Sequence, residues 1–184
     1  MTSEEVIVAV INALRAVDVP FMVVGSLATN FYGVPRSTRD ADFVIQVPPP
    51  SAALAECLGA NLRLTAQAAF EGVTGTVRHR IEARGTPFTV ELFQLSDDAH
   101  DMSRFSRRRS VRLFGRDVFV ATAEDTIVTK LRWAMHPGRE KDVDDVRSVI
   151  AVQGDGLDWT YVQHWCTQHG TSELLESIRQ SVQL

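Results

Sequence analysis

Two aspartates one residue apart, Asp40 and Asp42, open an apolar stretch with the composition of a buried strand. Alternate side chains of a strand point to the same face, so the two carboxylates are expected to lie together. Carboxylates this close repel each other unless a cation lies between them. Oxygen ligands of this kind suit hard divalent cations, which keep coordination positions open for substrate phosphates. The pair therefore predicts a site for Mg²⁺ or Mn²⁺.

A third carboxylate and a phosphate-binding turn complete the predicted site. Glu91 is the single acidic residue of an apolar run, and a strand there beside the Asp40 strand would add it to the metal ligands. Two metals held by three carboxylates can clamp the attacking and leaving oxygens of a nucleotidyl transfer. Upstream, Gly25 allows close approach of backbone to a phosphate. Ser26 offers a hydroxyl and an amide at a helix start, where anions are favoured.

The elements expected to position these residues form a mixed α/β (α+β) fold with a small mixed β-sheet and a helical C-terminal part. Apolar alternation and turn residues predict strands over 21–24, 40–47, 76–83 and 88–95, and a hairpin over 111–120. Helical periodicity predicts helices over 3–17, 27–32, 51–58 and 97–109, and then over 123–135, 142–152, 158–169 and 172–182. The composition change predicts a core over residues 1–121 and a helical region over 122–184.

Composition limits the function classes. The 184 residues are 45% hydrophobic with a net charge of −4, and no apolar run approaches the roughly 18 residues of a membrane helix. The acidic start and two distant cysteines favour a reduced, cytoplasmic protein. One basic run stands out in this acidic chain and suggests an RNA partner, with a solubilising surface as the alternative. Its members are Arg104, Arg107, Arg108, Arg109, Arg112 and Arg116.

The motifs together resemble the minimal nucleotidyltransferase superfamily, that of DNA polymerase β. The order is Gly25-Ser26, then Asp40-Ala-Asp42, then an acidic residue on a later strand. The sequence around these motifs resembles the prokaryotic branch of the superfamily that includes AbiEii-type nucleotidyltransferase toxins of toxin–antitoxin systems. The segments 122–133 and 141–146 are similar to the lysine motif and the Lys-Asp motif of that branch.

The resemblance implies roles for further residues. Arg36 and Thr38 would lie near nucleotide phosphates, and Lys130 would neutralise phosphate. Asp142 or Asp145 would orient that lysine. The substrate would be a nucleoside triphosphate (NTP), and Glu91, where the family usually has Asp, would also serve as the base. An antitoxin protein is implied as a partner.

Plainer interpretations stay open. Asp-x-Asp pairs are common at solvated strand ends, Lys130 could lie on a solvated helix face, and Asp142 and Asp145 could be first-turn acids. The five histidines are expected at the surface, and Trp133, Trp159 and Trp165 in the core. Three functions follow: nucleotidyl transfer to RNA, tRNA or protein, transfer to a small molecule as in aminoglycoside nucleotidyltransferases, or nucleotide or partner binding without catalysis.

Overall fold

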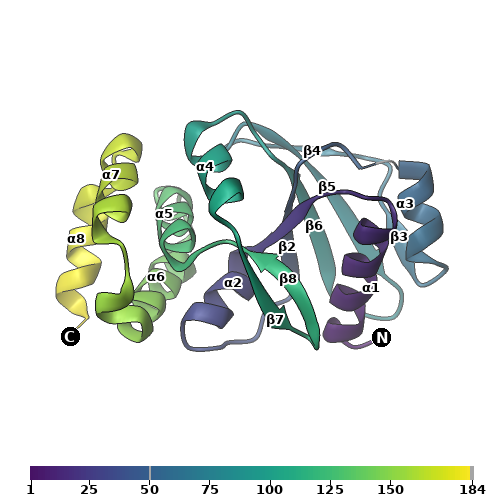
Figure 1. The fold of residues 1–184 in the computed structure, drawn as a ribbon, viewed down its shortest axis with the longest axis horizontal. Helices are drawn as coiled ribbons and strands as arrows, with labels where there is room; N and C mark the ends of the chain where they lie inside the picture. Colours follow the sequence, from purple (N-terminus) through teal and green to yellow (C-terminus); the bar gives the residue numbers. More distant parts are fainter. Residues whose placement is uncertain (50, 183–184) are drawn as a thin grey trace.

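The computed structural model describes residues 1–49 and 51–182, so Pro50 and the last two residues of the predicted helical region, 183–184, lie outside the described residues. Eight strands of the described chain join in one mixed sheet (Figure 1). Its order is β3-β5-β6-β2-β1-β8-β7, and β4 pairs with β5. The strands are β1 (Phe21–Val24), β2 (Asp40–Ile45), β3 (Leu62–Leu64), β4 (Ala69–Glu71), β5 (Thr76–Ala83), β6 (Thr89–Gln94), β7 (Arg109–Leu113) and β8 (Arg116–Val120). The β1–β8 and β2–β6 pairs are parallel and the others antiparallel.

One face of the sheet carries the main hydrophobic core. Phe43, Ile45 and Leu92 point to this side and are fully buried. Helices α1 (Ser3–Ala16) and α3 (Ser51–Leu58) cover it. Helix α1 begins with a capping box, in which Thr2 and Glu5 each accept a backbone hydrogen bond from the other. Odd-numbered positions of β2 therefore supply the core, as the sequence predicts.

The opposite face of the sheet carries a smaller apolar cluster and leaves room for polar side chains. Met22, Val24 and Val44 pack there against Phe105 of α4 (Ala99–Arg107). Asp40 and Asp42 have the same parity as Val44, so they lie on this second face. Helix α2 (Gly25–Tyr32) begins directly after β1.

The C-terminal helices build a cluster of their own at the end of the molecule opposite α1 and α3 (Figure 1). They are α5 (Ala123–Ala134), α6 (Glu140–Gln153), α7 (Trp159–His169) and α8 (Ser172–Ser181), with a 3₁₀ turn at Gly154–Gly156. Tyr32 of α2 packs against both this cluster and the main core. None of the helices in the described residues has the length and apolar character to cross a membrane.

Several local predictions were wrong. The helix expected over 97–109 ends at Arg107, because Arg109 already pairs with Val120 in the β7–β8 ladder. Two short strands, β3 and β4, lie in the weakly patterned stretch before β5. His100 is buried rather than exposed, since it lies under α7 beside the ring of Trp165. The three tryptophans are half-buried, and Trp159 and Trp165 pack against the core of the C-terminal helices, as predicted.

Candidate active site

Strand register brings the three predicted carboxylates together. In the β2 ladders, Asp42 lies opposite Val24 on one side and opposite Glu91 on the other. Asp40 precedes Asp42 by two residues and shares its face. The cluster therefore forms where β2 and β6 lie side by side, next to the start of α2.

Gly25 makes close packing against Asp42 possible. A Cβ added at this residue would lie 2.0 Å from Asp42 Oδ2, and the residue has a φ of +61°. Either fact alone favours glycine, because the left-handed region strains other residues and the carboxylate occupies the space. The first turn of α2 thus lies directly against the acidic cluster, which is the arrangement needed to hold a phosphate beside a carboxylate-bound cation.

Gly25→Ala is expected to lower the free energy of unfolding by more than the matched change Gly59→Ala. Gly59 also has a positive φ, +70°, but a Cβ there meets nothing within 4 Å. The control therefore measures the left-handed backbone alone, about 1–2 kcal/mol. Urea unfolding of both variants gives the comparison. Equal losses would show that Asp42 moves aside without cost.

Electrostatics at Asp42 favour a bound cation. Burial, together with the charges of Asp40 and Glu91, raises the pKa of Asp42 to about 7. An ionised Asp42 is therefore costly until a positive charge compensates it. Thr38 donates a hydrogen bond to Asp40 Oδ1 at 2.8 Å, which leaves the other oxygen of that carboxylate available. The available ligands are carboxylate oxygens, and the charge of Asp42 is poorly compensated. Both properties fit a hard divalent cation.

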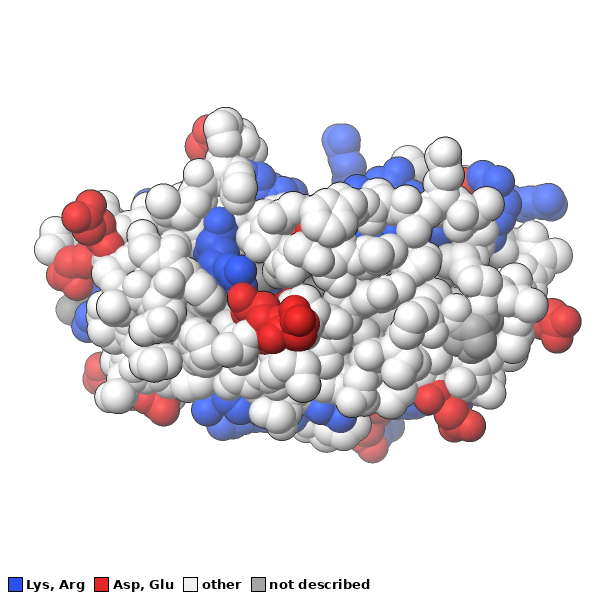
Figure 2. All heavy atoms as spheres, turned by 90° about the horizontal axis from the view of Figure 1, so that it is seen from above, with Lys and Arg blue, Asp and Glu red and all other residues white. Residues whose placement is uncertain are grey.

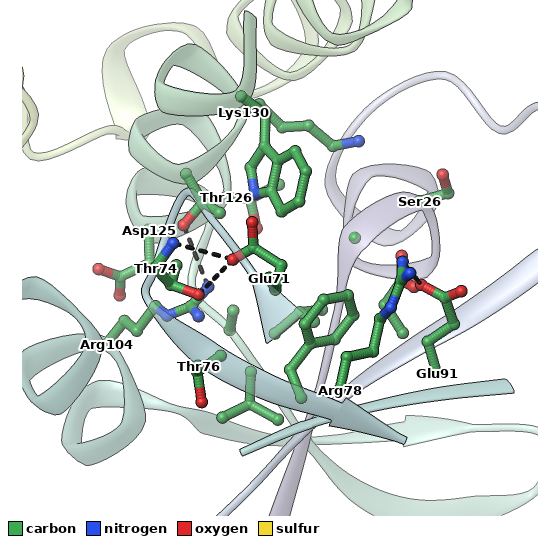
Figure 3. A pocket seen from close by; sticks show the side chains of 18 of the residues that line it. Ser26, Glu71, Thr74, Thr76, Arg78, Glu91, Arg104, Asp125, Thr126 and Lys130 are labelled. Atoms are coloured by element: carbon green, nitrogen blue, oxygen red, sulfur yellow. Dashed lines mark hydrogen bonds and ion pairs between the residues drawn. The ribbon is translucent and has the colours of Figure 1, made fainter. Parts of the chain in front are cut away.

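Glu91 differs from the two aspartates because two arginines of β5 already pair with it. Arg78 Nη1 lies 2.9 Å from Oε2, and Arg80 Nη2 lies 3.0 Å from Oε1. Figure 3 shows the Arg78 guanidinium beside Glu91 at the floor of the cleft. Arg80 reaches Glu91 because the two residues are paired across the β5–β6 ladder. A cation that uses Glu91 has to share the carboxylate with these guanidinium groups.

Lys130 is buried between two acids of α6 rather than on a solvated helix face. Its Nζ lies 2.8 Å from Asp142 Oδ1 and 2.8 Å from Asp145 Oδ2. Arg139 Nε binds the other oxygen of Asp142 at 2.5 Å. These contacts fix the lysine at the wall of the cleft, and they show why two aspartates three residues apart stand on one helix face.

Asp145 also connects this lysine to the loop before β2. Arg36 makes a two-pronged contact with it, Nε to Oδ1 at 2.7 Å and Nη2 to Oδ2 at 2.8 Å. Burial opposes ionisation, yet the hydrogen bond from Arg36 and the charge of Lys130 hold the pKa of Asp145 below its ordinary value. Arg36 Nη2 further donates to Ser26 Oγ at 3.3 Å. Ser26, Arg36 and Lys130 are thus joined through one carboxylate.

A cleft with a cavity volume of about 140 Å³, partly open to solvent, contains the acidic cluster. Its walls are the sheet, the first turn of α2, the β4–β5 turn, α4, α5 and the start of α6. The charged residues that line it are Asp40, Asp42, Glu71, Glu91, Asp125, Arg78, Arg104, Lys130, Arg139 and Lys141. Five are acidic and five basic, so the cleft has no single sign of charge.

Sequence reasoning missed several of these cleft residues. Glu71 is buried and accepts hydrogen bonds from the Val73 and Thr74 amides, so it holds the β4–β5 turn. Figure 3 shows Glu71 beside Thr74. Asp125 accepts from Thr122 Oγ1 at 2.7 Å and from the Tyr161 hydroxyl at 2.6 Å. The Thr122-x-x-Asp125 spacing indicates a helix cap, and it does not reveal the tertiary contact with Tyr161.

The arginine run does not form one basic surface. Arg104 is buried and pairs with Asp101, while the Arg107 guanidinium stacks over the Tyr161 ring at 3.8 Å. Arg108 packs over Phe105. Arg109 and Arg112 are exposed on β7, and none of residues 107–109 lines the cleft. On the face in Figure 2, basic side chains alternate with acidic and uncharged ones. The structure therefore gives no support to the predicted RNA contact.

Solved structures with this fold include nucleotidyltransferases. The antibiotic-resistance factor ANT(2'')-Ia has a TM-score of 0.62 at 15% identity, covering 97% of each chain. An antigenic nucleotidyltransferase-like protein from Paracoccidioides brasiliensis has a TM-score of 0.56 at 17% identity, covering 97% of this chain and 93% of that one. JHP933 from Helicobacter pylori has a TM-score of 0.54 at 16% identity, covering 97% of this chain and 89% of that one.

These similarities confirm the predicted fold. The chain has the minimal nucleotidyltransferase fold, a mixed α/β arrangement. No protein-family model matches the sequence, and no curated protein matches it. At 15–17% identity the neighbours establish the fold alone. Placement in the AbiEii-type branch stays a prediction.

Proposed function

We propose that this chain transfers a nucleoside monophosphate from an NTP to an acceptor hydroxyl, with Mg²⁺ bound at Asp40 and Asp42. The observation that carries the proposal is the contact between the start of α2 and the acidic cluster, where Gly25 leaves room only for the Asp42 carboxylate. A helix start that favours phosphate and a carboxylate pair that needs a cation meet there. Mg²⁺ would supply positive charge to the attacking and leaving oxygens.

The chain's own groups account for the remaining requirements. The α2 amides and Ser26 bind the triphosphate, and Lys130 offers it positive charge from α5. Asp145 acts as a positioning residue, because it holds both Lys130 and Arg36. In the reaction the acceptor oxygen bonds to the α-phosphorus, the bond to the bridging oxygen breaks, and pyrophosphate leaves. Glu91 takes the hydroxyl proton.

We further propose that the acceptor is a small molecule rather than RNA. Arg107–Arg109 do not line the cleft, and the charged residues that do are evenly divided between acidic and basic. The neighbour ANT(2'')-Ia is known in complex with adenylyl-2''-tobramycin, a nucleotidylated small molecule. A role as a toxin with an antitoxin partner rests on the sequence resemblance alone and has no support from the geometry.

The test is incubation of the protein with each labelled triphosphate, Mg²⁺ and separate acceptor pools. The pools are aminoglycosides, other polyhydroxylated small molecules, total RNA, and the protein alone. We expect label on a small molecule, with release of pyrophosphate and no transfer in EDTA. Label on RNA alone would contradict the acceptor assignment. Absence of label from every pool, with NTP still bound, would favour the non-catalytic alternative.

That second candidate, a nucleotide-binding module without catalysis, has one specific observation in its favour. Both oxygens of Glu91 are occupied by guanidinium groups, which leaves this carboxylate poorly placed to accept a proton. Calorimetry with Mg²⁺ and a non-hydrolysable NTP analogue detects the binding that both functions require. Only the transfer assay separates the two.

Arg80→Met is expected to strengthen Mg²⁺ binding about 2–5-fold, because it frees one Glu91 oxygen from a partly exposed ion pair of up to about 1 kcal/mol. Mg²⁺ titration by calorimetry gives the affinity. Arg63→Met is the matched control, since Arg63 of β3 pairs with Glu82 of β5 and does not line the cleft. Unchanged affinity in Arg80→Met would show that Glu91 is not a metal ligand.

A further inference from the structure

A second group of metal-ligating side chains lies outside the acidic cluster. One ligand atom each of Asp98, His100 and His169 falls within 4.8 Å of the others. Asp98 caps the start of α4, His100 is in its first turn, and His169 is the last residue of α7. The three therefore meet where α4 touches the C-terminal helices. Neither the predicted site nor the proposed transfer uses them.

The two imidazoles have free nitrogens in a buried setting. His100 is 1% exposed, and its Nε2 faces Asp125 Oδ1 at 3.2 Å. Within the described chain, Nδ1 of His100 and Nδ1 of His169 are both buried without a hydrogen-bond partner. Buried polar atoms are nearly always satisfied, so two orphaned nitrogens in one cluster point to an absent ligand. The ring centroids are 5.2 Å apart.

We propose that Asp98, His100 and His169 form a binding site for a transition-metal ion of the Zn²⁺ class, which joins α4 to α7. Two imidazoles and one carboxylate are a ligand set that Zn²⁺ accepts and that Mg²⁺ does not prefer. The Asp125–His100 contact supplies the carboxylate that commonly orients a metal-binding histidine through its second nitrogen. Three protein ligands leave the fourth position to water.

The surroundings agree with this assignment. Burial lowers the pKa of His100, and burial with the charge of Arg132 lowers the pKa of His169 to about 4, which favours the neutral form of imidazole that binds metals. The Trp165 ring stacks on His169 with 5.8 Å between centroids. Asp98 has a side chain that is 31% exposed, which gives an ion access from solvent.

Metal binding requires small local movements. Ligand atoms that share one tetrahedral Zn²⁺ at about 2.1 Å lie about 3.4 Å apart, so atoms up to 4.8 Å apart have to approach. Rotation of the half-buried His169 ring provides this. Arg132 Nη1, 3.3 Å from Asp98 Oδ1, is the competing charge, and the second Asp98 oxygen faces no such partner among the described contacts.

The test is Zn²⁺ titration of the chelator-stripped full chain by calorimetry, with Co²⁺ absorption as a spectroscopic probe. We expect one ion per chain with a Kd below about 10 µM. At 100-fold excess over Kd, the melting temperature should rise by about 5–10 °C. His169→Gln and Asp98→Asn should each weaken binding at least about 10-fold. Asn caps helices as well as Asp does, so the second variant is expected to fold.

Two controls make the result specific. His164→Gln removes an exposed histidine of α7 that also contacts Trp165, and it should bind Zn²⁺ like the wild type. Asp42→Asn should likewise retain the site, which separates it from the proposed donor site and from any failure of transfer. Wild-type Zn²⁺ affinity in both His169→Gln and Asp98→Asn would overturn the proposal. So would a wild-type Kd weaker than about 100 µM.

Discussion

Asp42→Asn is expected to abolish nucleotidyl transfer and, in the same protein, to increase stability in the absence of divalent cations. The loss of transfer should be about 10³-fold, the size seen when a preorganised electrostatic contact of a transition state is removed. Asn keeps the shape of the side chain but cannot offset the charge of a bound cation. Transfer falls while stability rises because the Asp42 carboxylate is needed to bind the cation but destabilises the folded protein when no cation is bound.

The stability effect follows from the raised pKa of Asp42, about 7. A carboxyl whose folded pKa lies above its unfolded value contributes stability at low pH and loses it as pH rises through the folded value. In EDTA the wild type should therefore lose stability between about pH 4 and pH 7, and Asp42→Asn should lose less. At about 1.4 kcal/mol per pKa unit the difference at pH 8 is at most about 4 kcal/mol.

Urea unfolding at pH 5 and pH 8, with EDTA or with Mg²⁺, measures the dependence of the free energy of unfolding on pH and on the cation. Mg²⁺ should stabilise the wild type more at pH 8 and should have little effect on Asp42→Asn. Asp144→Asn is the control, because Asp144 is an exposed acid of α6 paired with Arg147. A stabilised variant that retains full transfer would show that the metal site lies elsewhere.

The arrangement of Gly25, Asp40 and Asp42 could be predicted from sequence because it depends on residues close together in the chain. Strand alternation places Asp40 and Asp42 on one face, and Gly25 is the first residue of a short helix that begins beside Asp42. Glu91 required one further assumption, that its strand lies beside β2. The observed register, Asp42 opposite Glu91, confirms that pairing.

The rest could not be predicted because it depends on polar residues buried by tertiary contacts. The buried face of α4 consists mainly of His100, Asp101 and Arg104. Apolar periodicity therefore predicts a solvated helix at this position. Asp101 pairs with Arg104 of the same helix, and His100 contacts Asp125, which is distant in sequence. The Arg80–Glu91 pair depends on the register of the β5–β6 hairpin, which residue types alone do not fix.

Lys130→Met is expected to destabilise the protein by up to about 3–5 kcal/mol, the cost of removing one partner from a buried ion pair. Two buried acids would lose their shared cation: Asp142, which is fully buried, and Asp145, which is 2% exposed. Arg147→Met is the matched surface control and should cost less than about 1 kcal/mol, since its pair with Asp144 is solvated. Urea unfolding at pH 7.5 compares the two.

The double variant Lys130→Met/Asp142→Asn separates the structural role of Lys130 from its role in binding. Removing one of the two acids that share Lys130 should restore part of the lost stability, by at least about 1 kcal/mol for neighbours in one ion-pair network. Affinity for the Mg²⁺-bound NTP should stay low, because the cation at the cleft wall is still absent. If both stability and nucleotide affinity recover, Lys130 only neutralises the acids of α6. If neither stability nor nucleotide affinity recovers, Asp145, which also pairs with Arg36, is the acid that depends on the lysine.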